Sequence, residues 1–231
     1  MMRLKLNTCS GMVLIALATA SMSLTIPTVA AQEVTSAERT LFLDKHFEKT
    51  GKSTLTYLFH QKKGDGAAFD DKATVQVYER HPDGSASVAT QFLSDEHAFP
   101  VPPLERATGN PVILGFLEKD IAKMNRLTGG STNYFRKQIR MALAQPNVDS
   151  RTIQVDYGGH TVAAQALAIT PYSAEAQRER LGHYAEKAYV FVTSTDVPGV
   201  VYCLYTKMNA PTDAAADSSI RIEGSDPKQC R

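Results

Sequence analysis

The stretch from Asn110 to Gln145 constrains the fold most strongly, because it predicts two consecutive helices between two β-rich halves of the chain. Asn110 and Pro111 form a helix start signal: the Asn side chain can accept a bond from a first-turn N–H, and Pro needs no partner there. Gly129-Gly130 supplies a left-handed stop. Between these signals, apolar residues recur at helical spacing: Val112, Ile113, Phe116, Leu117, Ile121, Met124 and Leu127.

The second helix follows directly. Ser131 or Thr132 can cap it, and Pro146 prevents its continuation. Its apolar face consists of Phe135, Ile139, Ala142 and Leu143. Both helices must bury these faces, and a sheet formed by the two flanking β-rich halves is the expected partner.

Strand-like patterns occupy both flanks of the helix pair. Residues 53–93 predict a meander of three strands, and the residues after Pro146 predict four more, with a tight hairpin at Gly158-Gly159. Ile220 and Ile222 can add a short last strand. Further helices are predicted at Ser36–Lys49 and Ser173–Ala185.

We therefore expect an α+β fold: a strongly curved antiparallel sheet of about seven strands with the central helix pair packed on or across it. This plan is similar to the half-barrels of periplasmic lipoprotein carriers. The similarity is one of architecture, because the chain carries no motif of that family.

The N-terminus predicts export. Arg3 and Lys5 precede an apolar run from Met12 to Leu24, and Val29-Ala30-Ala31 fits a cleavage site. The alternative is a membrane anchor, but the run is shorter than the roughly 20 residues that span a bilayer. We expect residues 1–31 to be a cleaved signal peptide, and residues 32–231 to form one periplasmic or secreted domain with a polar C-terminal tail.

Two cysteines remain after cleavage, Cys203 and Cys230. An even number in an exported chain favours a disulfide, which would stabilise the fold by roughly 3 kcal/mol. It would attach the polar tail (Asp213–Arg231) to the strand that holds Cys203. Free or metal-binding thiols are the alternative, although no Cys-x-x-Cys spacing is present.

The charge balance argues against nucleic acid as a partner. The whole chain has 25 Lys and Arg residues and 24 Asp and Glu residues. The predicted signal removes two basic residues, which leaves 23 minus 24, or −1. No later segment is apolar enough to span a membrane, so we expect at most peripheral membrane contact. No cofactor motif is found, and none is expected.

No pattern selects a catalytic residue or a metal site. Asp95-Glu96-His97 offers three ligands that converge only if they lie in a loop, and a solvated acidic turn is the simpler interpretation. His160, after the Gly158-Gly159 turn, and His97 are the candidate bases of a hydrolase. Gly-x-Ser-x-Gly and His-Glu-x-x-His are both absent.

The helix pair contains the candidate ligand-binding residues. Its second helix carries basic residues beside aromatic ones, which suits an anionic head group, and Leu114 and Met141 lie outside the main apolar stripes. A solvated basic face and an ordinary core are the alternatives. The candidate residues are Phe116, Leu117, Ile121, Met124, Tyr134, Phe135, Arg136, Ile139 and Arg140.

Three functions are compatible with these patterns. The leading hypothesis is a non-enzymatic exported protein that binds an apolar or lipid-like ligand between the sheet and its helical lid. The second is an envelope structural or adaptor protein that binds another protein. The third is a hydrolase of unknown class.

Overall fold

The computed structural model describes residues 33–62, 68–208 and 217–230. Residues Val34–Arg231 form one compact unit. The predicted signal peptide and the first residues of the predicted tail lie outside the described residues. Among the helices that are described, none has both the length and the apolar character needed to cross a membrane.

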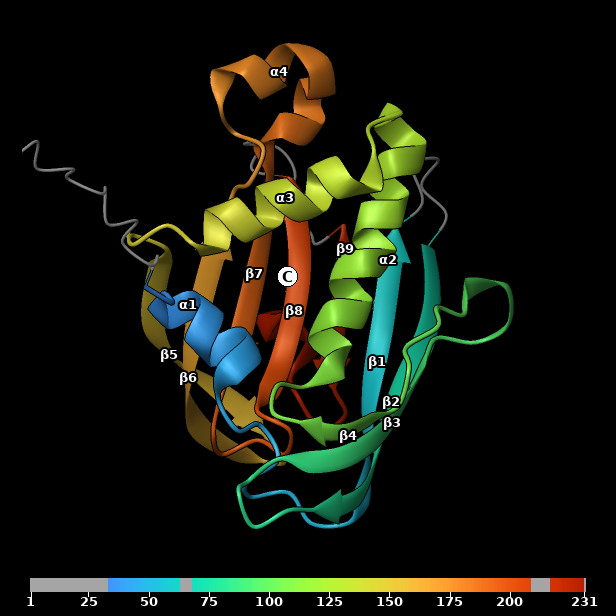
Figure 1. Cartoon of the computed structure of the whole chain (residues 1–231), viewed down its shortest axis with the longest axis vertical. Coiled ribbons are helices and arrows are strands. Elements are labelled where there is room, and N and C mark those ends of the chain that lie inside the picture. Colours follow the sequence, from blue (N-terminus) through green and yellow to red (C-terminus); the bar gives the residue numbers. More distant parts are fainter. Residues whose placement is uncertain (1–32, 63–67, 209–216, 231) are drawn as a thin grey trace, which may run out of the picture. The chain divides into compact units, whose positions relative to one another are not determined.

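The unit is built on an antiparallel sheet of nine strands in the order β4-β3-β2-β1-β9-β8-β7-β6-β5. It is open, with β4 and β5 at its edges, and it bends behind α2 and α3 (Figure 1). The strands are β1 (Ser53–Lys62), β2 (Ala68–Arg80), β3 (Ala86–Phe92), β4 (Leu104–Ala107), β5 (Asp149–Tyr157), β6 (His160–Ile169), β7 (Lys187–Thr193), β8 (Val201–Met208) and β9 (Ser218–Ile222).

The sheet consists of two meanders joined by the last strand. Strands β1 to β4 pair in sequence order, and so do β5 to β8. Strand β9 lies between them and pairs with β1 on one side and β8 on the other. Part of the predicted polar tail is therefore a central strand of the sheet.

The central helix pair forms as predicted, as α2 (Pro111–Thr128) and α3 (Thr132–Leu143). The Asn110 side chain accepts the Val112 N–H at 3.1 Å, and Gly129 ends α2 in the left-handed conformation. Ser131 caps α3. Both helices cross the same face of the sheet (Figure 1), which we call the inner face.

The expected count of about seven strands is too low. Strand β4 was missed because it has only four residues, of which Glu105 and Arg106 are charged and exposed. A short charged edge strand lacks the alternation that identifies a strand in the sequence. Strand β9 was predicted only as a possible addition.

The predicted helix Ser36–Lys49 is shorter than expected. It consists of one α-helical turn, α1 (Ser36–Glu38), and a π-helical segment, η1 (Arg39–Leu43). Thr35 and Glu38 form a capping box at its start. The second predicted helix becomes α4 (Glu175–Leu181) and the 3₁₀ segment η3 (Gly182–Glu186). Short 3₁₀ segments also occur at Asp95–His97 and Pro227–Gln229.

Most of the inner face beneath the helices is apolar. One row of buried side chains crosses five strands in register: Leu167, Phe191, Leu204, Ile220 and Phe59. Phe116, Met124 and Phe135 of the helices are also fully buried. The Cys203–Cys230 disulfide is present as predicted, and attaches the end of the chain to β8.

Candidate functional site

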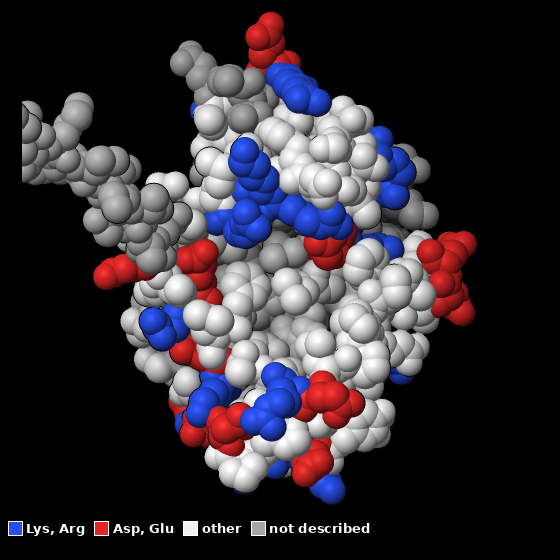
Figure 2. Space-filling view, in the orientation of Figure 1, with Lys and Arg blue, Asp and Glu red and all other residues white. Residues whose placement is uncertain are grey.

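An apolar groove of about 440 Å³ lies between the N-terminal helical segment (α1 and η1), α2 and α3. We call it the interhelical groove. Figure 2 shows an uncharged hollow in the region where Figure 1 places α1, α2 and α3. The groove is lined by Val34, Glu38, Phe42, Leu43, Leu114, Leu117, Glu118, Ile121, Arg136, Ile139, Arg140 and Leu143. Its volume is in the range of small-molecule sites, about 300–1,000 Å³.

Two acidic and two basic residues line the interhelical groove, Glu38, Glu118, Arg136 and Arg140, so their formal charges sum to zero. Arg136 forms two hydrogen bonds of 2.7 Å to the Glu118 carboxylate. Among the described residues, Arg140 has no ion-pair partner. In Figure 2, basic side chains gather along the upper border of the hollow, beside acidic ones. The predicted basic face therefore places two cations in the wall of the groove, Arg136 in an ion pair and Arg140 outside the ion pairs of the described residues.

The nine candidate ligand-binding residues fall into two groups. Five line the interhelical groove: Leu117, Ile121, Arg136, Ile139 and Arg140. The other four lie outside its lining: Phe116, Met124 and Phe135 in the core, and Tyr134, which contacts the Phe135 ring at 5.2 Å and lies beneath Arg180. The space directly between sheet and helix pair is thus occupied by packed side chains at these positions.

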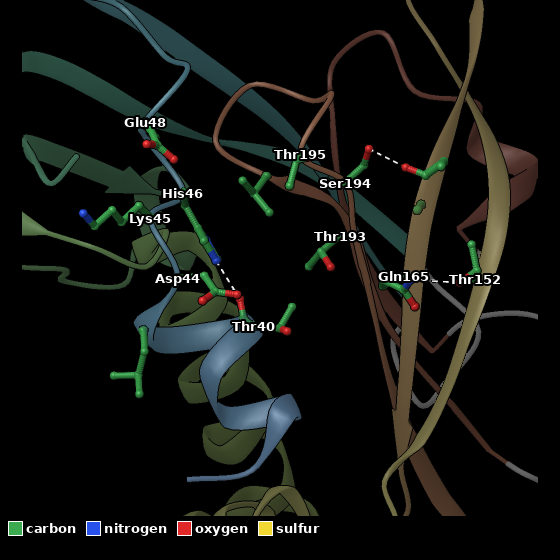
Figure 3. Close-up of a pocket in the computed structure, with 14 residues that line it drawn as sticks. Thr40, Asp44, Lys45, His46, Glu48, Thr152, Gln165, Thr193, Ser194 and Thr195 are labelled. Carbon is green, nitrogen blue, oxygen red and sulfur yellow. Dashed lines mark hydrogen bonds between the residues drawn. The ribbon is translucent and has the colours of Figure 1, made fainter. Parts of the chain in front are cut away.

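A second cavity, of about 660 Å³, lies on the other side of the N-terminal helical segment. Figure 3 shows its two walls: residues 40–48 on one side, and on the other β5, β6 and the end of β7 with the residues that follow it. We call it the hydroxyl cleft. It is lined by Thr40, Leu43, Asp44, Lys45, His46, Glu48, Thr152, Ala163, Ala164, Gln165, Thr193, Ser194, Thr195 and Val200.

The sheet wall of the hydroxyl cleft is a polar row in register. Thr152 pairs with Gln165, and Gln165 pairs with Thr193. Gln165 and Thr193 are two residues along their strands from Leu167 and Phe191, so they lie on the same inner face. This face therefore changes from apolar at the row of Leu167 and Phe191 to polar opposite residues 40–48.

His46 supports the other wall of the cleft. Its Nε2 lies 2.7 Å from the Thr40 carbonyl oxygen, and its Nδ1 accepts the Asn110 backbone N–H at 3.0 Å. The Nε2 therefore carries the proton and donates. Burial lowers the pKa of His46, and the Thr40 hydrogen bond and the Asp44 charge oppose this only in part. The neutral ring thus holds the start of α2 against the N-terminal segment.

A buried ionic cluster, which sequence reasoning missed, fastens α2 to the sheet. Lys187 donates to Asp120 at 2.6 Å and to Asp217 at 3.3 Å, and Asp217 also pairs with Lys123 at 2.8 Å. The Tyr189 hydroxyl donates to Asp120 at 2.7 Å. The one available signal was Asp120, which lies within the apolar stripe of α2, four residues from both Phe116 and Met124.

The pKa shifts in this cluster are those of a satisfied ion pair. Burial would lower the pKa of Lys187, but the charges of Asp120 and Asp217 outweigh it and raise this pKa. Burial would raise the pKa of Asp217, but Lys187 and Lys123 outweigh it and lower that pKa. Both side chains of the Lys187–Asp120 pair are 1% exposed, so the pair forms a contact between α2 and β7 that is closed to solvent.

The histidines considered as catalytic bases have ordinary surroundings. His160 is exposed at the start of β6, and the His97 ring stacks on Phe69 at 4.0 Å. Within the ranges that the structure describes, no group of three or more His, Cys, Asp or Glu side chains is arranged to hold a metal ion.

A scan against protein-family models matches no family, and a search of the curated proteins finds no match to this chain.

Proposed function

We propose that this protein is a non-enzymatic, exported binding protein that takes the apolar part of a lipid-like ligand into the interhelical groove. The observation that carries this proposal is the gathering of exposed apolar side chains at one place. Val34, Leu43 and Leu114 are each about half exposed, and all three line this groove. Apolar side chains that gather around a concave surface are typical of a ligand or partner site.

The proposed location differs from the one expected from the sequence. The space between the sheet and the helix pair is filled by core residues such as Phe116 and Phe135. The groove lies instead on the side of α2 and α3 that meets the N-terminal segment. A ligand there would be partly exposed, which suits an amphiphile better than a wholly apolar molecule.

Two features support export. The basic start, apolar run and small residues of positions 1–31 have the order of a signal peptide. The Cys203–Cys230 disulfide is typical of proteins in an oxidising compartment.

Ligand binding is tested with the protein purified from cells that express the full chain. We expect native mass spectrometry to detect a co-purified amphiphile, and calorimetric titration to detect binding of dodecanoate below its critical micelle concentration. The proposal would be refuted if the purified protein carries no amphiphile and does not bind dodecanoate.

The double substitution Leu43→Gln and Leu114→Gln locates the site. Each leucine would bury part of its surface against a bound chain, so we expect dodecanoate affinity to fall by about tenfold. Met141→Gln is the matched control, because Met141 is similarly exposed on α3 but lies outside the groove lining. Equal losses in both variants would place the ligand elsewhere.

The second candidate function is binding of a partner protein at the edge strand β5. The backbone N–H and C=O groups of Asp156 point away from β6: the N–H donates to the Gln229 side chain, and the C=O accepts from the Asp226 N–H. Alternate residues of a strand direct these groups to the same side, so the N–H and C=O groups of Gln154 and Thr152 also point outward. In the described part of the chain, these two residues have no strand neighbour on that side. An extended peptide could pair there. Cross-linking in intact cells is the test, and one stable neighbour attached through β5 is the expected result.

A further inference from the structure

The interhelical groove and the hydroxyl cleft meet at one side chain. Leu43 is in the lining of both cavities, and it is 50% exposed. The segment from Ser36 to Leu43 therefore lies between an apolar cavity and a polar one. A single ligand that passes over Leu43 would place one part of itself in each.

The hydroxyl cleft offers uncharged hydrogen-bonding groups. Within the described residues, the hydroxyls of Thr40, Thr193 and Thr195 make no hydrogen bond with another residue. The Gln165 amide donates to the Thr152 hydroxyl at 2.9 Å, which leaves its carbonyl oxygen available. Figure 3 shows Thr152, Gln165, Thr193 and Thr195 along the strand wall, facing residues 44–48, and Thr40 on the opposite wall. Hydroxyl and amide groups both donate and accept, as recognition of a polyol requires.

The charges of the hydroxyl cleft disfavour an anion. Asp44, Lys45 and Glu48 line it, and His46 is held neutral by burial, so the ionised groups sum to −1. An anionic head group would meet more negative than positive charge there. Arg140 is in the wall of the groove and not of the cleft.

We propose that the hydroxyl cleft binds the uncharged, hydroxyl-rich head group of an amphiphile whose alkyl chain lies in the interhelical groove, which makes the ligand a glycolipid in chemical class. This inference rests on the proposed function, since it requires the chain to occupy the groove. It adds the identity of the head group and the residues that recognise it.

Three probes with alkyl chains of similar length test the head group: dodecyl maltoside, dodecylphosphocholine and dodecanoate. Each is titrated calorimetrically into the full chain below its critical micelle concentration. We expect dodecyl maltoside to bind most tightly, by about tenfold, since several neutral hydrogen bonds each contribute a factor of about two to ten.

A double variant with Thr193→Val and Gln165→Ala tests whether the head group binds in the hydroxyl cleft. It removes one hydroxyl at nearly constant shape and one amide, so dodecyl maltoside should bind about tenfold more weakly while dodecanoate changes less than twofold. Thr74→Val, on β2 and outside both cavities, is the control and should change neither affinity. If the double variant has a lower unfolding midpoint, Gln165→Ala alone is used, because Gln165 is exposed.

The outcomes separate the two proposals. Equal binding of all three probes, or loss of dodecanoate and maltoside binding alike in the cleft variants, overturns the head-group assignment and leaves the groove as an alkyl-chain site. Preference for the phosphocholine or carboxylate probe overturns it as well. Failure of all three probes to bind refutes the proposed function itself.

Discussion

At the scale of single residues, His46 couples the structure to pH. The ring is 1% exposed and uses both nitrogens, one as donor to Thr40 and one as acceptor from Asn110. Protonation of Nδ1 would remove the acceptor for the Asn110 N–H. The lowered pKa of His46 follows from this burial. As the pH falls, the histidine of the unfolded chain therefore binds a proton at a higher pH than the histidine of the folded chain does.

We therefore predict that stability falls as the pH drops below about 6.5, the usual pKa of histidine. The folded pKa is lowered, so the loss begins at the unfolded value and continues down to the folded one, by at most about 1.4 kcal/mol per pH unit. Urea unfolding between pH 7.5 and 5.5 measures it. His46→Gln should be less stable at pH 7.5 but should depend less on pH, and an unchanged slope in this variant would contradict the assignment.

The burial of Lys187 leads to a second prediction about the free energy of unfolding. Lys187→Met leaves the Asp120 carboxylate buried without its cation, so we expect a loss of about 3–5 kcal/mol in the free energy of unfolding. Adding Asp120→Leu removes the stranded charge and should restore much of that loss, because well-packed apolar pairs can replace buried ion pairs. Urea unfolding of both variants measures the difference. A double variant no more stable than the single one would show that the ion pair itself is required.

At the scale of elements, the start of α2 is a junction of several segments. The Asn110 amide donates to the Tyr57 hydroxyl at 2.7 Å and to the Gly199 carbonyl at 2.9 Å, while its oxygen caps the helix. Gly199 has a φ of +71°, and a Cβ there would lie 2.7 Å from the Asn110 amide nitrogen. This cap thus connects α2 to β1 and to the turn between β7 and β8.

Asn110→Asp should consequently destabilise far more than an ordinary cap substitution. The aspartate keeps the cap acceptor but replaces the two-donor amide with an oxygen that faces the Gly199 carbonyl, at a cost of about 2–4 kcal/mol. Ser131→Ala, which removes the cap of α3 at an exposed position, should cost about 1 kcal/mol. Thermal and urea unfolding compare the two, and similar costs would show that the Asn110 donors contribute little.

At the scale of the whole unit, β9 and the disulfide hold the two meanders together. The Cys203–Cys230 bond closes a separation of 27 residues that includes β9, and the chain-entropy model assigns it about 3–4 kcal/mol. We predict that Cys230→Ser raises amide exchange in β9 and β8 before it does so in the β2–β3 hairpin. Hydrogen exchange with mass spectrometry measures this order. Uniform loss of protection across the sheet would mean that the meanders unfold as one unit.

The sequence alone determined the features that depend on neighbours along the chain. The caps and stops of α2 and α3, the Gly158-Gly159 turn and most strands were predicted because each requires only a few consecutive residues. The disulfide was predicted by elimination, since two cysteines remained in the expected mature chain. Five candidate ligand residues reached the groove wall because helical spacing specifies which side chains share a face.

Only the tertiary structure decided how those elements combine. Strand β9 joins the two meanders by pairing Ser218 with Gln61 of β1, 157 residues earlier in the chain, and short antiparallel strands permit several such pairings. The Lys187–Asp120 contact spans 67 residues, and the two cavities meet at Leu43 only because α1 and η1 dock between sheet and helices. Packing between distant segments creates these features, so no local pattern encodes them.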